Sequence, residues 1–177
     1  MKQKIRILLS LSALLSTVTF FFSGNHVNAQ GFCTHSGSYK IRGDFDGDKR
    51  KDTLCTDNEG RKWIAYSNGR RWENLSTKWC SHKNSSITVG DFNGDGSSDL
   101  LCHDTEGRNW IIYSNEDGNF GNFSSDWTAT SAFCTHRGSE LYAKDINRDG
   151  RDDLVCTDVT NKKWYVYAQV SGTFDLR

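Results

Sequence analysis

The sequence predicts an all-β protein built from three tandem repeats. Three observations lead to this prediction: a set of residues recurs at intervals of 47 and 54 positions, each copy contains the same Asp-rich loop, and each copy contains a short aromatic and β-branched run after that loop. No segment keeps the 3.6-residue apolar spacing of an amphipathic helix. We therefore expect roughly four short strands in each repeat, packed around a shared core.

The first residues have the three parts of a secretory signal peptide. A basic start is followed by an apolar run from 7 to 22 and by small or neutral residues that end at Ala29. The apolar run contains Ser and Thr and is shorter than the ~20 apolar residues of a membrane span, so an uncleaved anchor is the weaker interpretation. We expect residues 1–29 to be removed and the protein to be secreted. The repeats then divide the remaining chain, 30–177, at about 33–79, 80–133 and 134–177.

The charge balance argues against two classes of partner. The chain has 22 basic and 22 acidic residues, and without the leader 19 basic residues stand against 22 acidic ones. A nucleic-acid binder is expected to carry a basic stripe, which this sequence lacks. No second apolar segment is long enough to cross a membrane. We expect neither a nucleic-acid partner nor a membrane span.

Six cysteines follow the leader, and they recur with the repeat. In an oxidising compartment an even number of cysteines suggests disulfides, although six allow 15 pairings. The first and second cysteine of each repeat are 22 positions apart, so the simplest symmetric solution is one bridge per repeat. The alternative is a zinc site in which neighbouring His and Asp residues join the cysteines, which secretion makes less attractive. The expected pairs are Cys33 with Cys55, Cys80 with Cys102, and Cys134 with Cys156.

Each repeat contains a loop suited to a hard cation. Side-chain oxygens stand at loop positions 1, 3, 5 and 9, and position 7 can offer its backbone carbonyl. Ca²⁺ takes roughly 6–8 oxygen ligands, so three loops predict up to three calcium ions. An EF-hand would need a Glu at position 12 between helices, and a cysteine stands there in all three loops. The remaining alternative is a set of Asp- and Gly-rich surface turns. The candidate ligands are Asp44, Asp46, Asp48, Arg50 and Asp52; Asp91, Asn93, Asp95, Ser97 and Asp99; and Asp145, Asn147, Asp149, Arg151 and Asp153.

The segment from Gly90 to Leu100, with weaker copies at 43–54 and 144–154, resembles the calcium-binding FG-GAP or VCBS-type repeats. These repeats occur in integrin alpha chains and in secreted lectin-like and adhesion proteins. The resemblance implies that each repeat is a four-stranded propeller blade with calcium held in a hairpin loop. The paired cysteines are not general to that family. Propellers usually have about 4–8 blades, so three repeats leave open an arc, an unusual closure, or a homo-oligomer that completes the ring.

The repeat also aligns residues that could bind a ligand. His35, His82 and His136 recur beside the first cysteines, and Trp63, Trp110 and Trp164 could stack on sugar rings. The alternative is that these residues recur only because the blade recurs. N-glycosylation sequons begin at Asn74, Asn84 and Asn122.

The motifs favour recognition over catalysis. Arg42-Gly43-Asp44 spells an integrin-recognition tripeptide, but a calcium ion would occupy the Asp44 carboxylate. No nucleophile elbow, phosphate loop or zinc-protease motif is present in the sequence, and we expect no enzyme activity. We expect a secreted calcium-binding recognition module, lectin-like and directed at carbohydrate. The first alternative is an extracellular protein-interaction or adhesion protein. The second is a small secreted enzyme or toxin that uses the repeated histidines together with the acids two positions after the second cysteines, Asp57, Asp104 and Asp158.

Overall fold

The structure is a computed structural model that describes residues 31–34, 36–69, 71–72, 78–115, 117–118, 120, 125 and 127–175. The expected leader lies outside these residues, as do His35, Asn74 and Asn122. Asn84 is described, and it lies exposed in a turn with φ of 61°.

Three antiparallel sheets make up the described part of the chain, which contains no helix. In each sheet the strands lie in chain order, so that every sheet is a meander. The all-β prediction and the three repeats are therefore confirmed. The first sheet contains β1 (Tyr39–Gly43), β2 (Asp52–Thr56), β3 (Lys62–Ala65) and β4 (Arg71–Trp72). The second contains β5 (Ser85–Gly90), β6 (Asp99–Asp104), β7 (Arg108–Ile112) and β8 (Trp127–Thr130). The third contains β9 (Glu140–Lys144), β10 (Asp153–Thr157) and β11 (Lys163–Val166).

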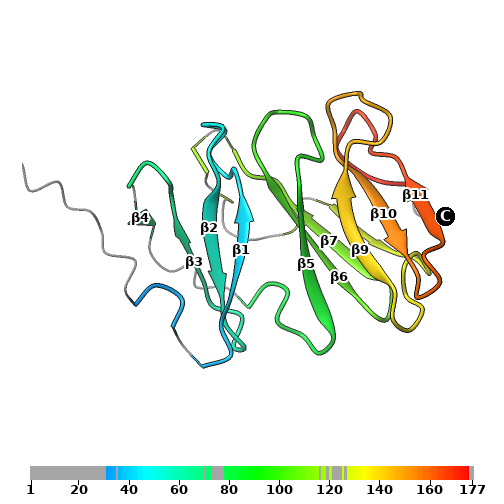
Figure 1. Ribbon diagram of the computed structural model, residues 1–177, viewed down its shortest axis with the longest axis horizontal. Coiled ribbons are helices and arrows are strands. Elements are labelled where there is room, and N and C mark those ends of the chain that lie inside the picture. The colour runs from blue at the N-terminus through cyan, green and yellow to red at the C-terminus, as the bar shows by residue number, and fades with distance from the viewer. Residues whose placement is uncertain are drawn as a thin grey trace, which may run out of the picture.

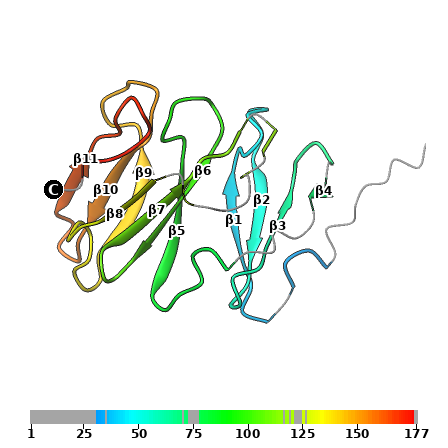
Figure 2. The same ribbon diagram turned by 180° about the vertical axis from the view of Figure 1, so that it is seen from behind.

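The third sheet has three strands, so the prediction of three four-stranded blades is wrong for this repeat. The fourth strands of the first two sheets, β4 and β8, come from residues that precede the next repeat's first cysteine. After β11 the chain instead turns back on itself, and Ala168 forms an isolated bridge with Phe174. Figures 1 and 2 show the three sheets side by side in chain order, forming an open row in which the first and third sheets do not meet.

Neighbouring sheets share two apolar cores. The first core lies between the first and second sheets, where the ring of Phe45 meets Phe120 edge to face with centroids 5.6 Å apart. The second lies between the second and third sheets, where Phe92 contacts Phe174 in the same way at 5.4 Å. Burial of these aromatic side chains is the main favourable term that holds one sheet against the next. The core is thus divided into layers between sheets.

One disulfide crosslinks each repeat, as the spacing of 22 positions between its cysteines predicts. The bridges join Cys33 to Cys55, Cys80 to Cys102 and Cys134 to Cys156. The zinc alternative is excluded, because no described cysteine is free. The first cysteine of each pair has a positive φ, between 55° and 62°, which non-glycine residues rarely adopt. A serine five positions later donates its hydroxyl to the cysteine carbonyl in all three repeats, which explains why serine recurs there.

None of the described residues forms a helix with the length and apolarity that a membrane crossing requires.

Candidate functional site

The three Asp-rich loops lie at one end of the sheets and are joined to one another (Figure 1). The Asp44 amide donates to the Ser98 hydroxyl at 3.1 Å, and the Ser98 amide donates to the Asp44 carbonyl at 2.6 Å. Likewise, the Asp91 amide donates to the Asp152 carboxylate at 3.0 Å, and the Asp152 amide donates to the Asp91 carbonyl at 2.7 Å. Position 1 of one loop is thus bonded to position 8 of the next. The loops form a continuous row, and we call it the acidic row.

The first loop gathers three carboxylates in a way that fits a cation. Asp44, Asp46 and Asp48 each offer an oxygen within 4.8 Å of the others. The Oδ1 atom of Asp44 is buried and has no hydrogen-bond partner. Ca²⁺ prefers closely spaced carboxylate oxygens as ligands, and an oxygen without a hydrogen-bond donor is free to bind it. Arg50 competes for part of this charge, because its guanidinium pairs with Asp48 at 2.7 Å.

The second and third loops fold in the same way, but backbone amides satisfy both oxygens of their first carboxylate, whereas among the described residues Asp44 of the first loop accepts only the Lys49 amide, on Oδ2. Asp91 accepts hydrogen bonds from the amides of Gly94, Asp95 and Gly96. Asp145 accepts the equivalent bonds from the amides at 148, 149 and 150. In the third loop Arg151 also pairs with Asp149, so a cation there would have to compete with a guanidinium.

The acid at position 9 has a structural role that the sequence analysis missed. Asp99 is fully buried, and its two oxygens accept the amides of Phe92 and Ser114. Burial raises the pKa of Asp99 to about 8, and the nearby Asp95 and Asp91 carboxylates act in the same direction. A calcium-binding role for position 9 stays a prediction. Asp52 and Asp153 are buried in the same way. Asp52 accepts hydrogen bonds from the amides of Phe45 and Ser67. Asp153 accepts them from the amides of Ile146 and Ala168.

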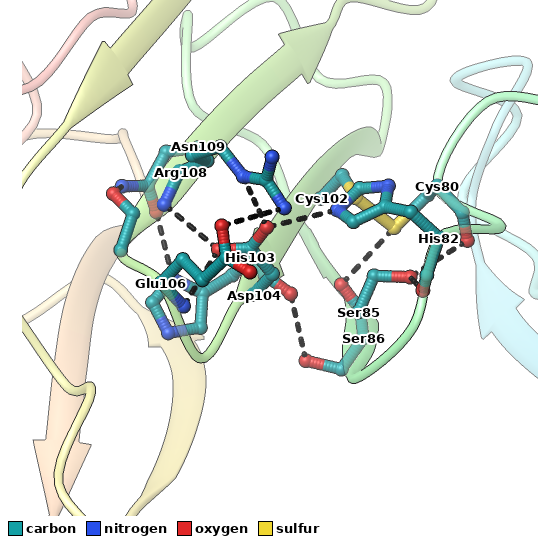
Figure 3. A network of polar contacts seen from close by, with 11 residues as sticks. Cys80, His82, Ser85, Ser86, Cys102, His103, Asp104, Glu106, Arg108 and Asn109 are labelled. Atoms are coloured by element: carbon teal, nitrogen blue, oxygen red, sulfur yellow. Dashed lines mark hydrogen bonds and ion pairs between the residues drawn. A yellow bond between two sulfur atoms is a disulfide. The ribbon is translucent and has the colours of Figure 1, made fainter.

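The opposite end of the sheets carries a repeated cluster around the tryptophans. In the second repeat, Asp104 accepts Arg108 Nε at 2.7 Å and lies 3.1 Å from His82 Nε2 (Figure 3). The guanidinium of Arg108 lies over the Trp110 ring at 5.7 Å, and His82 contacts the same ring edge to face at 4.8 Å. Asp104 also accepts the amides of Glu106 and Arg108, so it shapes the turn between β6 and β7. We call this arrangement the tryptophan cluster.

The tryptophan cluster recurs in the other repeats. In the third repeat, Lys162 lies over Trp164 at 4.9 Å and His136 contacts the ring at 5.2 Å. In the first repeat, Arg61 lies over Trp63 at 5.9 Å. The cation over the ring was missed in the sequence analysis, although a basic residue stands two positions before each tryptophan. The predicted His and Trp residues are therefore brought together in the two repeats where both are described.

The acid of the tryptophan cluster is held in its charged form. Burial opposes ionisation of Asp104, but hydrogen bonds from Arg108 and Glu106 outweigh it and lower the pKa of this carboxyl. A side-chain hydrogen bond from Thr160 likewise lowers the pKa of Asp158, the equivalent acid of the third repeat. These carboxylates therefore organise their turns as fixed acceptors.

A hollow of about 280 Å³ opens beside the third tryptophan cluster. It lies where the second sheet leads into the third, next to the disulfide of the third repeat. Its walls are mostly apolar, with one imidazole and one indole that can offer a polar atom or a flat face. The lining residues are Ala132, Phe133, Cys134, His136, Cys156 and Trp164.

A buried lysine joins the first repeat to the second near this end. Lys62 is fully buried, and its Nζ donates to the carbonyls of Gly60 and Trp79. Burial lowers the pKa of Lys62 to about 8. In the second repeat Asn109 stands at the same position, donates to Gly107 and accepts from His103. These polar groups bind turn carbonyls at the junctions between repeats.

A family comparison agrees with this architecture. The model of the FG-GAP-like repeat matches residues 44–102 and again 91–156. The chain belongs to the FG-GAP-like repeat family. Both matches begin at position 1 of an acidic loop and end at the second cysteine of the following repeat, so they follow the structural period of this FG-GAP-like chain.

Two further comparisons bear on this FG-GAP-like protein. No curated protein sequence matches it. Among solved structures, a lectin from Agrocybe aegerita is similar, with a TM-score of 0.62 and 18% sequence identity over 78% of this chain. That structure is described as showing specific recognition of non-reducing terminal N-acetylglucosamine. The chain spans 37% of the lectin's length. At 18% identity, the similarity between the two proteins is a similarity of fold.

Proposed function

We propose that this FG-GAP-like protein is a secreted, non-enzymatic recognition module that binds carbohydrate through its tryptophan clusters and calcium through its acidic row. The observation that carries the proposal is the hollow beside Trp164, which joins an apolar wall to an indole and an imidazole. Small-ligand sites combine an apolar lining with a few placed polar groups in this way. The three disulfides support an oxidising, extracellular setting.

The geometry of the tryptophan cluster supports binding over catalysis. A general base needs a free acceptor and a pKa near the working pH. Asp104 instead accepts hydrogen bonds from two amides and from Arg108, which also hold its pKa low. His82 therefore faces a carboxylate that is already compensated. This arrangement keeps the indole fixed, as a rigid surface for a sugar ring requires.

Calcium would act on the acidic row mainly as a structural ion. It would bind oxygens at positions 1, 3 and 5 and offset the repulsion among carboxylates that Asp44, Asp46 and Asp48 illustrate. Because each loop is hydrogen-bonded to the next, an ordered loop also orders its neighbour.

Addition of calcium is expected to raise the stability of the mature protein. Extracellular modules bind Ca²⁺ with Kd of about 10⁻⁴–10⁻³ M. At about 10 mM free Ca²⁺, one such site adds roughly 1.4–2.7 kcal/mol to the free energy of unfolding. The gain can be measured by urea unfolding in calcium and in chelator, with stoichiometry from calorimetric titration. The variant Asp46→Ala should lose one site, whereas Glu140→Gln, an exposed acid outside the loops, should lose none. Equal stoichiometry in both variants would contradict the assignment of the first loop.

Glycan binding is tested with the purified mature protein on a glycan array, in calcium and in chelator. Glycans that end in N-acetylglucosamine are the first to examine, given the similar lectin. We expect selective binding that weakens by about tenfold or more in Trp164→Ala, which corresponds to about 1.4 kcal/mol or more. Tyr39→Ala is the matched control, since it removes an exposed aromatic outside the clusters. Absence of glycan binding by folded, calcium-loaded protein would overturn the lectin proposal and favour a protein partner.

A further inference from the structure

The two junctions between repeats require a glycine at one fixed position. Gly43 and Gly90 end the first strand of their sheets, β1 and β5, and both are buried. A Cβ atom on Gly43 would lie 2.8 Å from the Phe45 ring of its own repeat and 2.9 Å from Val89 of the next repeat. A Cβ atom on Gly90 would lie 2.6 Å from Ala143 of the next repeat. Real Cβ atoms do not approach so closely, so glycine is required here both by an aromatic ring of its own repeat, Phe45 or Phe92, and by the apolar side chain that faces it from the next repeat.

The outer face of the third repeat departs from this pattern. Lys144 stands where the junctions have glycine, and its side chain is exposed. Tyr165 is 45% exposed, whereas Ile64 and Ile111 at the equivalent positions are completely buried. We call this surface, formed by Lys144, Ile146, Tyr165 and Tyr167, the tail face.

The outer face of the first repeat departs from the pattern as well. Arg42 stands where the junctions have Val89 and Ala143, and it is exposed. Lys40, also exposed, replaces Ile87 and Leu141, which pack against the two cores. We call this surface, formed by Lys40, Arg42, Thr53 and Ala65, the head face.

A second copy of the chain could extend the row only by placing its head face on the tail face. In the geometry of the existing junctions, Arg42 of the second copy would take the place of Val89 or Ala143 and would meet Lys144. Two cationic side chains would then meet where, at the existing junctions, a buried glycine faces an apolar side chain. Like charges that are desolvated together at an interface cost several kcal/mol.

We propose that Arg42 and Lys144 keep the three-repeat row open by preventing a second copy from docking head to tail. The protein is then expected not to form a homo-oligomer that completes a ring. This expectation does not depend on the proposed carbohydrate binding. Terminal repeats with polar outer faces are also what keeps other repeat proteins soluble. In this protein Lys144 and Arg42 have that role. Lys144 stands where the junctions have glycine, and Arg42 stands where they have valine or alanine.

The test restores the junction residues at both ends. The triple variant Lys40→Ile, Arg42→Val, Lys144→Gly copies the residues of the second repeat onto the two outer faces. Sedimentation equilibrium at about 100 μM should give the mass of one chain for the wild type and at least about a twofold higher mean mass for the triple variant. The control Lys40→Ile, Arg42→Val adds the same apolar residues but keeps Lys144, and it should stay at the mass of one chain.

A mixing experiment covers the case in which the triple variant fails to fold. The control variant carries a restored head face, and Lys144→Gly alone carries a restored tail face. Mixed together, the two should form a complex that neither forms alone, with thermal unfolding used to check that each is folded. Self-association of the wild type, a folded triple variant that stays at the mass of one chain, or a control that associates as strongly as the triple variant would each overturn the proposal.

Discussion

Replacing Phe92 by alanine is expected to lower the free energy of unfolding by about 3–5 kcal/mol. Phe92 is fully buried between the second and third sheets, and its ring meets Phe174 edge to face at 5.4 Å. Truncation removes the aromatic contact and leaves a cavity that the surrounding sheets can close only in part. Urea unfolding followed by circular dichroism measures the loss through the transition midpoint.

The matched control for this prediction is Ile146→Ala. Ile146 is the equivalent loop residue of the third repeat and donates its amide to Asp153, as Phe92 does to Asp99. Ile146 is only half-buried, because it lies on the tail face with no sheet beyond it. The control should therefore cost clearly less than Phe92→Ala. Similar losses in both variants would show that the core is not divided into layers between sheets.

Removing the Cys80–Cys102 bridge by a double alanine substitution is expected to cost about 3 kcal/mol. The bridge closes a loop of 22 positions, and in the chain-entropy model a loop of this length restricts the unfolded chain by that amount. The measurement is urea unfolding of the variant beside the wild type, with the other two bridges intact.

The three bridges provide their own control for this prediction. The Cys33–Cys55 bridge closes a loop of the same 22 positions, so its removal should lose the same entropic contribution. Any larger loss on removing Cys80–Cys102 then measures packing, because the second sheet has a neighbour on each side. A loss well below about 1 kcal/mol for both bridges would contradict the entropic account.

Features that repeat in the sequence could be predicted well. The cysteine spacing predicted the pairing because an identical separation in every repeat makes one bridge per repeat the simplest symmetric solution. In the first loop, the alternate carboxylates of Asp44, Asp46 and Asp48 lie within 4.8 Å of one another. The aromatic and β-branched run of each repeat forms a strand, β3, β7 or β11, as its composition predicts. Local spacing is sufficient for such features because each sheet forms from one contiguous stretch.

Features that depend on a neighbouring repeat could not be predicted. In the first two sheets the fourth strand comes from the segment that leads to the next repeat. The third repeat is not followed by another one in the described row of sheets, and its sheet has three strands, although the repeat pattern predicts four. The amide bonds of the position 9 acids, such as those of Asp99 with Phe92 and Ser114, exist only in the folded turn, so the sequence pattern indicates these acids only as candidate ligands. The contact between Gly43 and Val89 joins residues 46 positions apart, which no local pattern indicates.

The meander order of the sheets also bears on how the chain acquires its disulfides. Every strand pairs with a strand that adjoins it along the chain, and every bridge joins two cysteines of the same sheet. Each cysteine therefore has its partner within the same contiguous stretch of chain, and that stretch is complete in sequence before the next repeat begins. Contacts between nearby residues also form quickly, because little loop entropy is lost in closing them. Oxidation can thus proceed one repeat at a time, from the amino end onward, without any bridge having to be reshuffled.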